Sequence, residues 1–245
     1  MIPGFTAITQ KGFKSTMGFE SSNLTAVLIA DFLNIKNIQI WTDVEGIRNA
    51  DPDIFANTYT IKNINYDEAY IAALNGVKLF YPLMLYYAKQ NNITIEYRSF
   101  LKTNGDFSII NNTKTQYHKI ITYTDDLSHY YVEENLDNIK TEKNINVNLD
   151  EYEYLESKKA GNTIFNKTIN PGFHFSNNDH NNKALCYTIL NPSKNDDFKV
   201  IELLKELDLE FIKFNAEKNI IQLFIHNFQA EKLSQKFYDV LFLSE

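Results

Sequence analysis

Over roughly the first 110 residues, segments whose apolar residues have helical spacing alternate with segments whose apolar residues have strand spacing. The polar residues at 21–23 can cap a helix, because their side chains can bond the free amides at a helix start. The apolar residues that follow at helical spacing are Leu24, Val27, Leu28 and Phe32. A short buried strand is predicted at 38–41, helices beginning at Tyr66 and Pro82, and an alternating strand at 93–97. This order is typical of an α/β domain over residues 1–110.

The pattern changes after residue 110. Residues 103–118 are rich in Asn and Thr and are predicted to be a linker, with a strand at 119–124 and a helix at 130–140 behind it. Elements between 143 and 182 cannot be assigned from the pattern. The last sixty residues predict strand, helix, strand, strand and a helix that runs into a short strand, which is the ferredoxin-like α+β order. The core-facing stripe predicted for these helices comprises Phe198, Ile201, Leu204 and Leu207.

Composition excludes several classes of protein. A formal net charge of −7 and a pI near 5.3 argue against a nucleic-acid binder, which needs a basic face. No apolar run is long enough for a transmembrane helix, and the first residues do not read as a signal peptide, so a cytoplasmic protein is expected. The single cysteine, Cys186, lies in an apolar run and is predicted to be a buried core thiol rather than a nucleophile.

Candidate chemistry is concentrated in the segment WTDVEGIRNADP, residues 41–52. It places Thr42, Asp43 and Gly46 directly after a predicted strand, where ligands bind in open α/β sheets. The hydroxyl and the carboxylate can bond a sugar or a base edge, and the glycine allows close backbone approach. A plain strand-to-turn connection would have the same residues, so the pattern alone leaves both interpretations open.

Other polar clusters give weaker evidence of a functional site. His174, Asp179 and His180 match no standard zinc spacing and are interpreted as a polar loop. No metal site and no nucleophile elbow or P-loop is predicted.

Four segments in order resemble the aspartokinases of the amino acid kinase fold. That family has G-R-x-G-S-D-Y-T-A, W-T-D-V-x-G-[VI]-Y-x-x-D-P-R, Y-x-E-A and G-A-K-V-L-H-P. This chain has GFESSNLTA, WTDVEGIRNADPD, YDEA and GVKLFYP, at compatible spacing over about 65 residues. The resemblance implies the nucleotide-binding half of a three-layer amino acid kinase-like domain over residues 1–110. It also implies two ferredoxin-like ACT modules, at 111–182 and 183–245.

Carried over position by position, the resemblance implies a partly kept nucleotide site. Thr42 and Asp43 match the nucleoside contacts, with Gly46 in the same loop, and Lys78 matches the lysine near the nucleotide phosphates. Of the substrate-binding residues in the family pattern, Ser22 is the one that this chain keeps. ATP with Mg²⁺ is therefore the implied ligand, and no protein ligand for the metal is identified.

Several positions depart from the family pattern. Phe19 replaces the arginine expected to hold the substrate carboxylate, and a phenyl ring cannot donate the two hydrogen bonds that arginine supplies. Ser21, Asn23 and Arg48 replace a glycine, an aspartate and a tyrosine, and Asp53 reverses the charge of an arginine. The K-[FY]-G-G-[TS] segment with the catalytic lysine is absent, so no catalytic residue is assigned.

Three hypotheses follow. The first is a degenerate aspartokinase-family protein that acts as a regulatory or binding subunit of amino-acid biosynthesis. It would hold an amino-acid effector at an ACT interface and form a homodimer or associate with a full-length kinase. The alternative is the ATP-binding part of a split or truncated aspartate kinase, which makes 4-phospho-L-aspartate. The third is a scaffold that binds no small molecule.

Overall fold

The computed structural model describes residues 2–18, 21–77, 79–113, 117–132, 152–156, 162–167, 183–217 and 219–243. The chain forms two compact units. The first comprises Met1–Thr122 and Ile189–Ser193, and the second comprises Tyr123–Thr188 and Lys194–Glu245. The first unit is therefore discontinuous in sequence. The three-module division at residues 110 and 182 stays a prediction.

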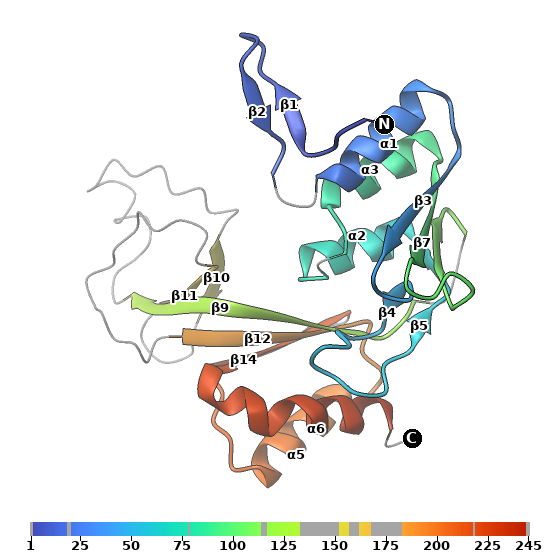
Figure 1. Cartoon of the computed structure of the whole chain (residues 1–245). Coiled ribbons are helices and arrows are strands. Elements are labelled where there is room, and N and C mark those ends of the chain that lie inside the picture. Colours follow the sequence, from blue (N-terminus) through green and yellow to red (C-terminus); the bar gives the residue numbers. More distant parts are fainter. Residues whose placement is uncertain are drawn as a thin grey trace. The chain divides into compact units, whose positions relative to one another are not determined.

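The first unit is built on a four-stranded sheet with the order β3-β7-β8-β6 (Figure 1). Its strands are β3 (Asn37–Thr42), β7 (Thr94–Ser99), β8 (Ser108–Asn111) and β6 (Asn63–Asn65). β3 pairs with β7 in parallel, as an α/β domain requires, and β8 runs antiparallel to β7 and parallel to β6. The linker predicted at 103–118 is wrong in its centre, because β8 lies there between two other strands.

Three helices lie on one side of this sheet (Figure 1). They are α1 (Ser22–Phe32), α2 (Tyr66–Leu74) and α3 (Pro82–Asn91). Asn65 caps α2 by accepting the Glu68 amide at 2.9 Å, and Pro82 opens α3 as predicted. The capping predicted for α1 is wrong. Its cap residue, Ser21, makes no side-chain cap bond, because its backbone is helical (φ −69°, ψ −5°) and not extended as in a capping residue. The Ser21 hydroxyl donates to the Gly18 carbonyl at 2.6 Å.

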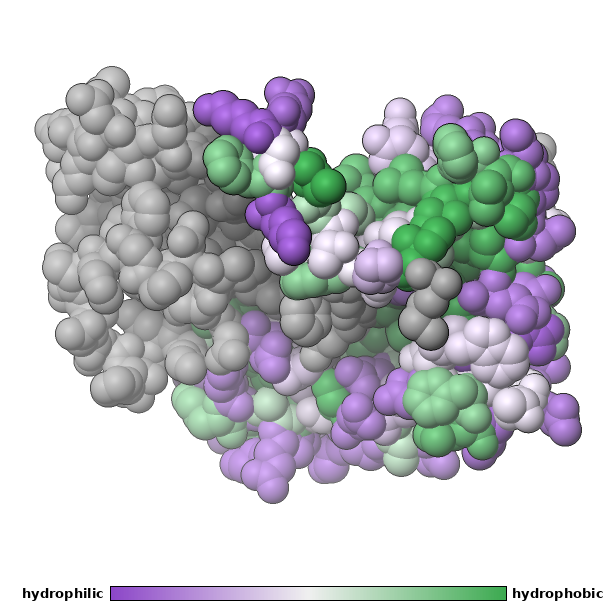
Figure 2. Space-filling model, turned by 45° about the horizontal axis from the view of Figure 1, so that its top comes forward, coloured by the Kyte–Doolittle hydropathy of each residue, from purple (hydrophilic) through white to green (hydrophobic). Residues whose placement is uncertain are grey.

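The helix layer buries fewer apolar residues than the pattern predicts. Leu24 and Val27 are buried, but Leu28 and Phe32 of the predicted stripe are exposed. Figure 2 shows green, apolar side chains on the surface of the first unit where α1 and α3 lie. The strand predicted to be buried at 38–41 is also only half-buried, with Trp41 45% exposed, because β3 is an edge strand.

Two short ribbons complete the first unit. β1 (Thr6–Ile8) and β2 (Lys14–Thr16) form an antiparallel hairpin. β4 (Ile47–Arg48) and β5 (Thr60–Ile61) form a second antiparallel pair, which follows the β3 strand directly. The loop that the sequence singles out therefore joins the sheet to a small ribbon.

The second unit contains most of a six-stranded sheet with the order β10-β11-β9-β12-β14-β13. The strands are β9 (Ile120–Val132), β10 (Tyr152–Glu156), β11 (Asn162–Lys167), β12 (Lys183–Leu190), β13 (Lys213–Glu217) and β14 (Ile220–His226). The strand predicted at 119–124 extends further, so residues 130–132 are strand and not the start of the predicted helix. Residues 133–140, the rest of that predicted helix, lie outside the described residues.

The carboxyl-terminal part has the predicted strand-helix-strand-strand-helix order. α5 (Asp196–Glu206) follows β12, and η2 (Asn227–Gln229) and α6 (Ala230–Phe242) follow β14. The described residues after α6 form no strand, so the short final strand predicted there is not seen up to residue 243.

Aromatic and aliphatic side chains fill the core of the second unit. Phe237 of α6 packs on Tyr187 of β12 with ring centroids 4.9 Å apart. In α5 the predicted stripe is displaced: Leu204 is buried, but Phe198 is 58% exposed, and Val200 and Leu203 take its place. Cys186 is a buried thiol that forms no disulfide, as predicted. No helix of the described residues is long and apolar enough to cross a membrane.

Because Tyr66 is buried, the first unit is expected to lose stability at alkaline pH. Its hydroxyl donates to the Ile93 carbonyl at 2.6 Å, and burial raises the pKa of Tyr66 to about 12. The folded protein therefore keeps the Tyr66 phenol neutral at pH values where the unfolded chain ionises it. This contribution to the free energy of unfolding is fully present below pH 10 and is lost between about pH 10 and pH 12. We expect urea midpoints, followed by the fluorescence of Trp41, to fall over this range. In Tyr66→Phe the urea midpoint should fall less with pH than in the unmodified protein, whereas substitution of the exposed Tyr86 by Phe should leave the fall unchanged. Equal pH slopes of the midpoint in the two variants would contradict the assignment of this effect to Tyr66.

Candidate functional site

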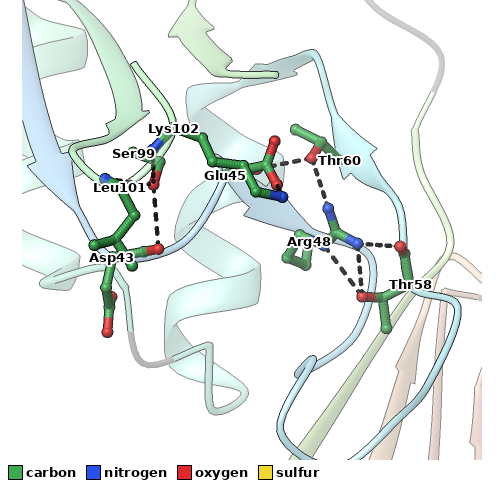
Figure 3. A network of polar contacts seen from close by, with 8 residues as sticks. All are labelled: Asp43, Glu45, Arg48, Thr58, Thr60, Ser99, Leu101 and Lys102. Carbon is green, nitrogen blue, oxygen red and sulfur yellow. Dashed lines mark hydrogen bonds and ion pairs between the residues drawn. The ribbon is translucent and has the colours of Figure 1, made fainter. Parts of the chain in front are cut away.

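The candidate site lies where the parallel strands β3 and β7 end together. Thr42 is paired with Ser99 in the strand register, and the Phe100 amide donates to the Thr42 carbonyl at 2.8 Å. The loop after β3 and the loop after β7 therefore start side by side (Figure 3). This confirms that Thr42 and Asp43 stand at the carboxyl end of a parallel pair, where α/β sheets bind ligands.

Ser99 fixes the two loops to each other. Its side chain is buried and donates to the Asp43 carbonyl at 3.2 Å. The same hydroxyl accepts the amides of Leu101 and Lys102, at 3.2 and 3.4 Å. A single buried hydroxyl thus satisfies three backbone groups of the two loops, which holds the Asp43 backbone in place (Figure 3).

The side chains of Thr42 and Asp43 form the accessible part of the site. The Thr42 hydroxyl donates to Oδ1 of Asp43 at 2.9 Å, which orients the carboxylate. Asp43 is exposed and Thr42 is half-buried, so the carboxylate is open to a ligand. An oriented and accessible carboxylate is an acceptor for the hydroxyls or amines of a ligand.

An ion pair joins the same two loops further out. Lys102 Nζ lies 2.5 Å from Oε1 of Glu45, and this bond lowers the pKa of the Glu45 carboxyl. Lys102 is well exposed, so the pair contributes little to stability. It places an accessible ammonium group at the rim of the site.

Gly46 makes a close approach, but to the protein's own strands. Its φ is +71°, and a Cβ at this position would lie 2.5 Å from Oγ of Ser108 and 2.9 Å from a Thr60 methyl carbon. Ser108 is fully buried. It accepts the Ile47 amide at 2.7 Å and donates to the Ile61 carbonyl at 2.5 Å. The glycine is therefore needed for the ribbon to pack on β8, and its predicted nucleotide contact stays a prediction.

Arg48, a departure from the family pattern, is used inside the ribbon. Its guanidinium donates to the Thr60 hydroxyl at 2.9 Å and to the hydroxyl and carbonyl of Thr58. The Thr60 hydroxyl in turn donates to the Glu45 carbonyl at 2.7 Å (Figure 3). Through Thr60, the arginine thus stabilises the loop that carries Asp43.

The structure gives less information on the remaining predicted site residues. Ser22 is exposed at the start of α1, beside Gly4. Lys78 and Phe19 lie outside the described residues, as do His174, Asp179 and His180. The part of the chain that the structure describes holds no group of three His, Cys, Asp or Glu residues arranged for a metal ion.

The sequence pattern does not predict the contribution of the second loop. It assigns no role to Ser99 and Lys102, although the segment SFLKTNG follows a strand as WTDVEG does. This repeated order of strand, polar residue and glycine is the signal that could have identified them.

Comparisons with known proteins agree with this geometry. The model of the amino acid kinase family matches residues 1–96. An aspartokinase of Thermus thermophilus is 34% identical over 104 residues, which are 42% of this chain and 26% of that protein. The chloroplastic aspartokinase 3 of Arabidopsis thaliana is 27% identical over 125 residues, 49% of this chain and 22% of that protein. These matches span about a quarter of the length of the relatives.

Solved structures share the fold over nearly the whole chain. Aspartokinase III of E. coli, in complex with aspartate and ADP, superposes with a TM-score of 0.75 at 19% identity, over 98% of this chain and 60% of that one. The aspartate kinase of Clostridium acetobutylicum gives 0.73 at 16% identity, over 98% and 62%. Residues 1–96 are therefore similar to the amino acid kinase family, and the fold of the chain is similar to that of solved aspartokinases.

Proposed function

We propose that the first unit binds Mg-ATP at the ends of β3 and β7, and that the chain serves as a degenerate, regulatory or binding subunit of the aspartokinase family. The oriented carboxylate of Asp43 carries the proposal. It is accessible, it is held through its backbone by Ser99 and through its side chain by Thr42, and it stands at the ligand-binding end of a parallel pair.

Each residue of the site has a proposed part in this binding. Asp43 accepts the ribose hydroxyls of the nucleotide, and Thr42 orients it. Lys102 offsets phosphate charge as a point charge, together with Lys78. Mg²⁺ is held by the phosphates and water.

Titration calorimetry with Mg-ATP tests this proposal. We expect Asp43→Ala to weaken binding at least about tenfold, because hydrogen bonds to a charged group contribute about 1.5–3 kcal/mol. Asp31→Ala, which removes an exposed carboxylate from α1, is the matched control and should change the affinity less than about twofold. No heat with the unmodified chain at millimolar Mg-ATP, or equal effects of the two substitutions, would refute the site.

The alternative is the ATP-binding part of a split or truncated aspartate kinase. It is favoured by the E. coli relative, which was solved with aspartate and ADP. Phe19 argues against it, because a phenyl ring stands where the family pattern has an arginine for the substrate carboxylate. A coupled assay with ATP and aspartate distinguishes the two, since phosphoryl transfer by the purified chain would replace the subunit proposal.

A second proposed function is amino-acid sensing by the second unit. It rests on the β12-α5-β13-β14-α6 order, which suits an ACT-like module. An E. coli aspartokinase III structure with lysine and aspartate has a TM-score of 0.61 at 18% identity. The effector would bind at an interface, in a homodimer or in an assembly with a full-length kinase. The same calorimetry with lysine, threonine and methionine in place of ATP tests it, and silence for all three removes it.

A further inference from the structure

A buried carboxylate lies in the first turn of α2, away from the candidate site. The Glu68 side chain is 1% exposed, and its Oε1 accepts the backbone amide of His118 at 2.5 Å. The side-chain amide of Asn191 donates to the same oxygen at 3.4 Å and to the His118 carbonyl at 2.9 Å. Three segments far apart in the sequence are therefore joined at one oxygen atom.

The pairing of this carboxylate is incomplete. Nδ1 of His118 lies 3.3 Å from Oε1 of Glu68 but is not in hydrogen-bonding geometry. Oε2 of Glu68 is buried without a partner among the residues that the structure describes. A buried acceptor without a partner costs free energy that an apolar side chain would not. Packing alone therefore does not account for a glutamate here.

The opposite end of α2 is held by the same segment. The hydroxyl of Thr122 donates to the carbonyl of Asn75, the residue that caps the helix at its carboxyl end. The neighbouring Ile121 amide donates to the Asn49 carbonyl at 2.8 Å, next to the Arg48 ribbon. Residues 118–122 thus bond α2 at both ends.

These segments are also where the chain passes between the two units. β9 leaves the first unit after Thr122, and β12 returns to it at Ile189. Asn191 follows directly, before the chain leaves again at Lys194. The residues that bond to Glu68 and Asn75 therefore lie close in sequence to the points at which the chain crosses between the units.

We propose that Glu68, His118 and Asn191, together with Thr122 on Asn75, form a clasp that transmits displacements of β9 and β12 to α2. The bond from the His118 amide to Glu68 is short, at 2.5 Å, and buried, so breaking it leaves buried polar groups without a partner. Residues 75–77 follow α2 and lead to Lys78. The clasp therefore gives the second unit a route to the predicted phosphate contact, and this last step rests on the proposed nucleotide function.

Hydrogen exchange of the full chain tests the clasp without any ligand. Glu68→Ala should accelerate exchange at 66–77, 117–122 and 189–193 at least tenfold, and Glu68→Gln, which keeps the shape and one acceptor, should restore part of the protection. Asp67→Asn is the matched control: it removes a charge from the same helix turn, where Asp67 pairs with Lys89 at the surface. It should leave these three segments within about twofold.

Asn191→Gly provides a second variant, because Asn191 has a φ of +52° that glycine adopts without strain. It should accelerate exchange at 66–77 and 117–122 while β3 and β7 keep their protection. Unchanged exchange in both the Glu68 and the Asn191 variants, or equal acceleration in β3 and β7, would overturn the clasp. The Mg-ATP affinity of Asn191→Gly is measured separately. An affinity change of threefold or more supports the route to Lys78, and an unchanged affinity with released segments removes that step alone.

Discussion

Gly46→Ala is expected to destabilise the first unit by about 3 kcal/mol. An alanine at φ +71° is strained, and its Cβ would lie 2.5 Å from Oγ of Ser108 and 2.9 Å from its amide nitrogen. Ser108 cannot move away, because it bonds the Ile47 amide and the Ile61 carbonyl at the same time. Urea unfolding followed by the fluorescence of Trp41, the single tryptophan, reports on this unit.

Gly12→Ala separates strain from steric conflict. Gly12 also has a positive φ, +81°, but a Cβ there would meet no atom within 4 Å. Its cost should be about 1 kcal/mol, the backbone part alone. Equal losses in the two variants would mean that the packing of Gly46 on Ser108 contributes nothing.

Phe237→Ala is expected to destabilise the second unit by about 3–5 kcal/mol. The ring is fully buried in α6 and packs on Tyr187, so its removal leaves a cavity that the neighbouring strand β12 cannot close. The loss should appear as faster hydrogen exchange in β12, β14 and α6, and as a lower midpoint of thermal unfolding by circular dichroism.

Phe228→Ala is the control for this substitution. The same side chain is 80% exposed in η2, so its loss should change stability by less than about 0.5 kcal/mol. A Phe237→Ala protein as stable as the Phe228→Ala protein would contradict the assignment of α6 to the core of the second unit.

Local signals predicted the elements that carry them. α2 begins at an asparagine cap with two acidic residues in its first turn, and α3 begins at Pro82, so both starts are confirmed. β8 was missed because Ile109 and Ile110 are surrounded by polar residues, and the strand is stabilised by its neighbours β7 and β6. Residues 130–132 belong to β9 because they pair with β11, thirty residues further along the chain.

The candidate site was predicted for its first loop only. Thr42 and Asp43 follow a recognisable strand, and strand ends can be read from the sequence. Ser99 and Lys102 join them only because β7 is the neighbour of β3 in the sheet, and strand order is not encoded locally. Arg48 illustrates the same limit, since its partners Thr58 and Thr60 face it across an antiparallel ribbon.

The discontinuity of the first unit has a consequence for synthesis on the ribosome. Asn191 is made 123 residues after Glu68, and the intervening chain includes the residues of the second unit from Tyr123 to Thr188. At about 5–20 residues per second, Glu68 emerges roughly 6–25 s before Asn191 can reach it. Its buried carboxylate therefore lacks one of its donors throughout this interval, and the amino-terminal part of the nascent chain stays incomplete until the other unit has begun to emerge.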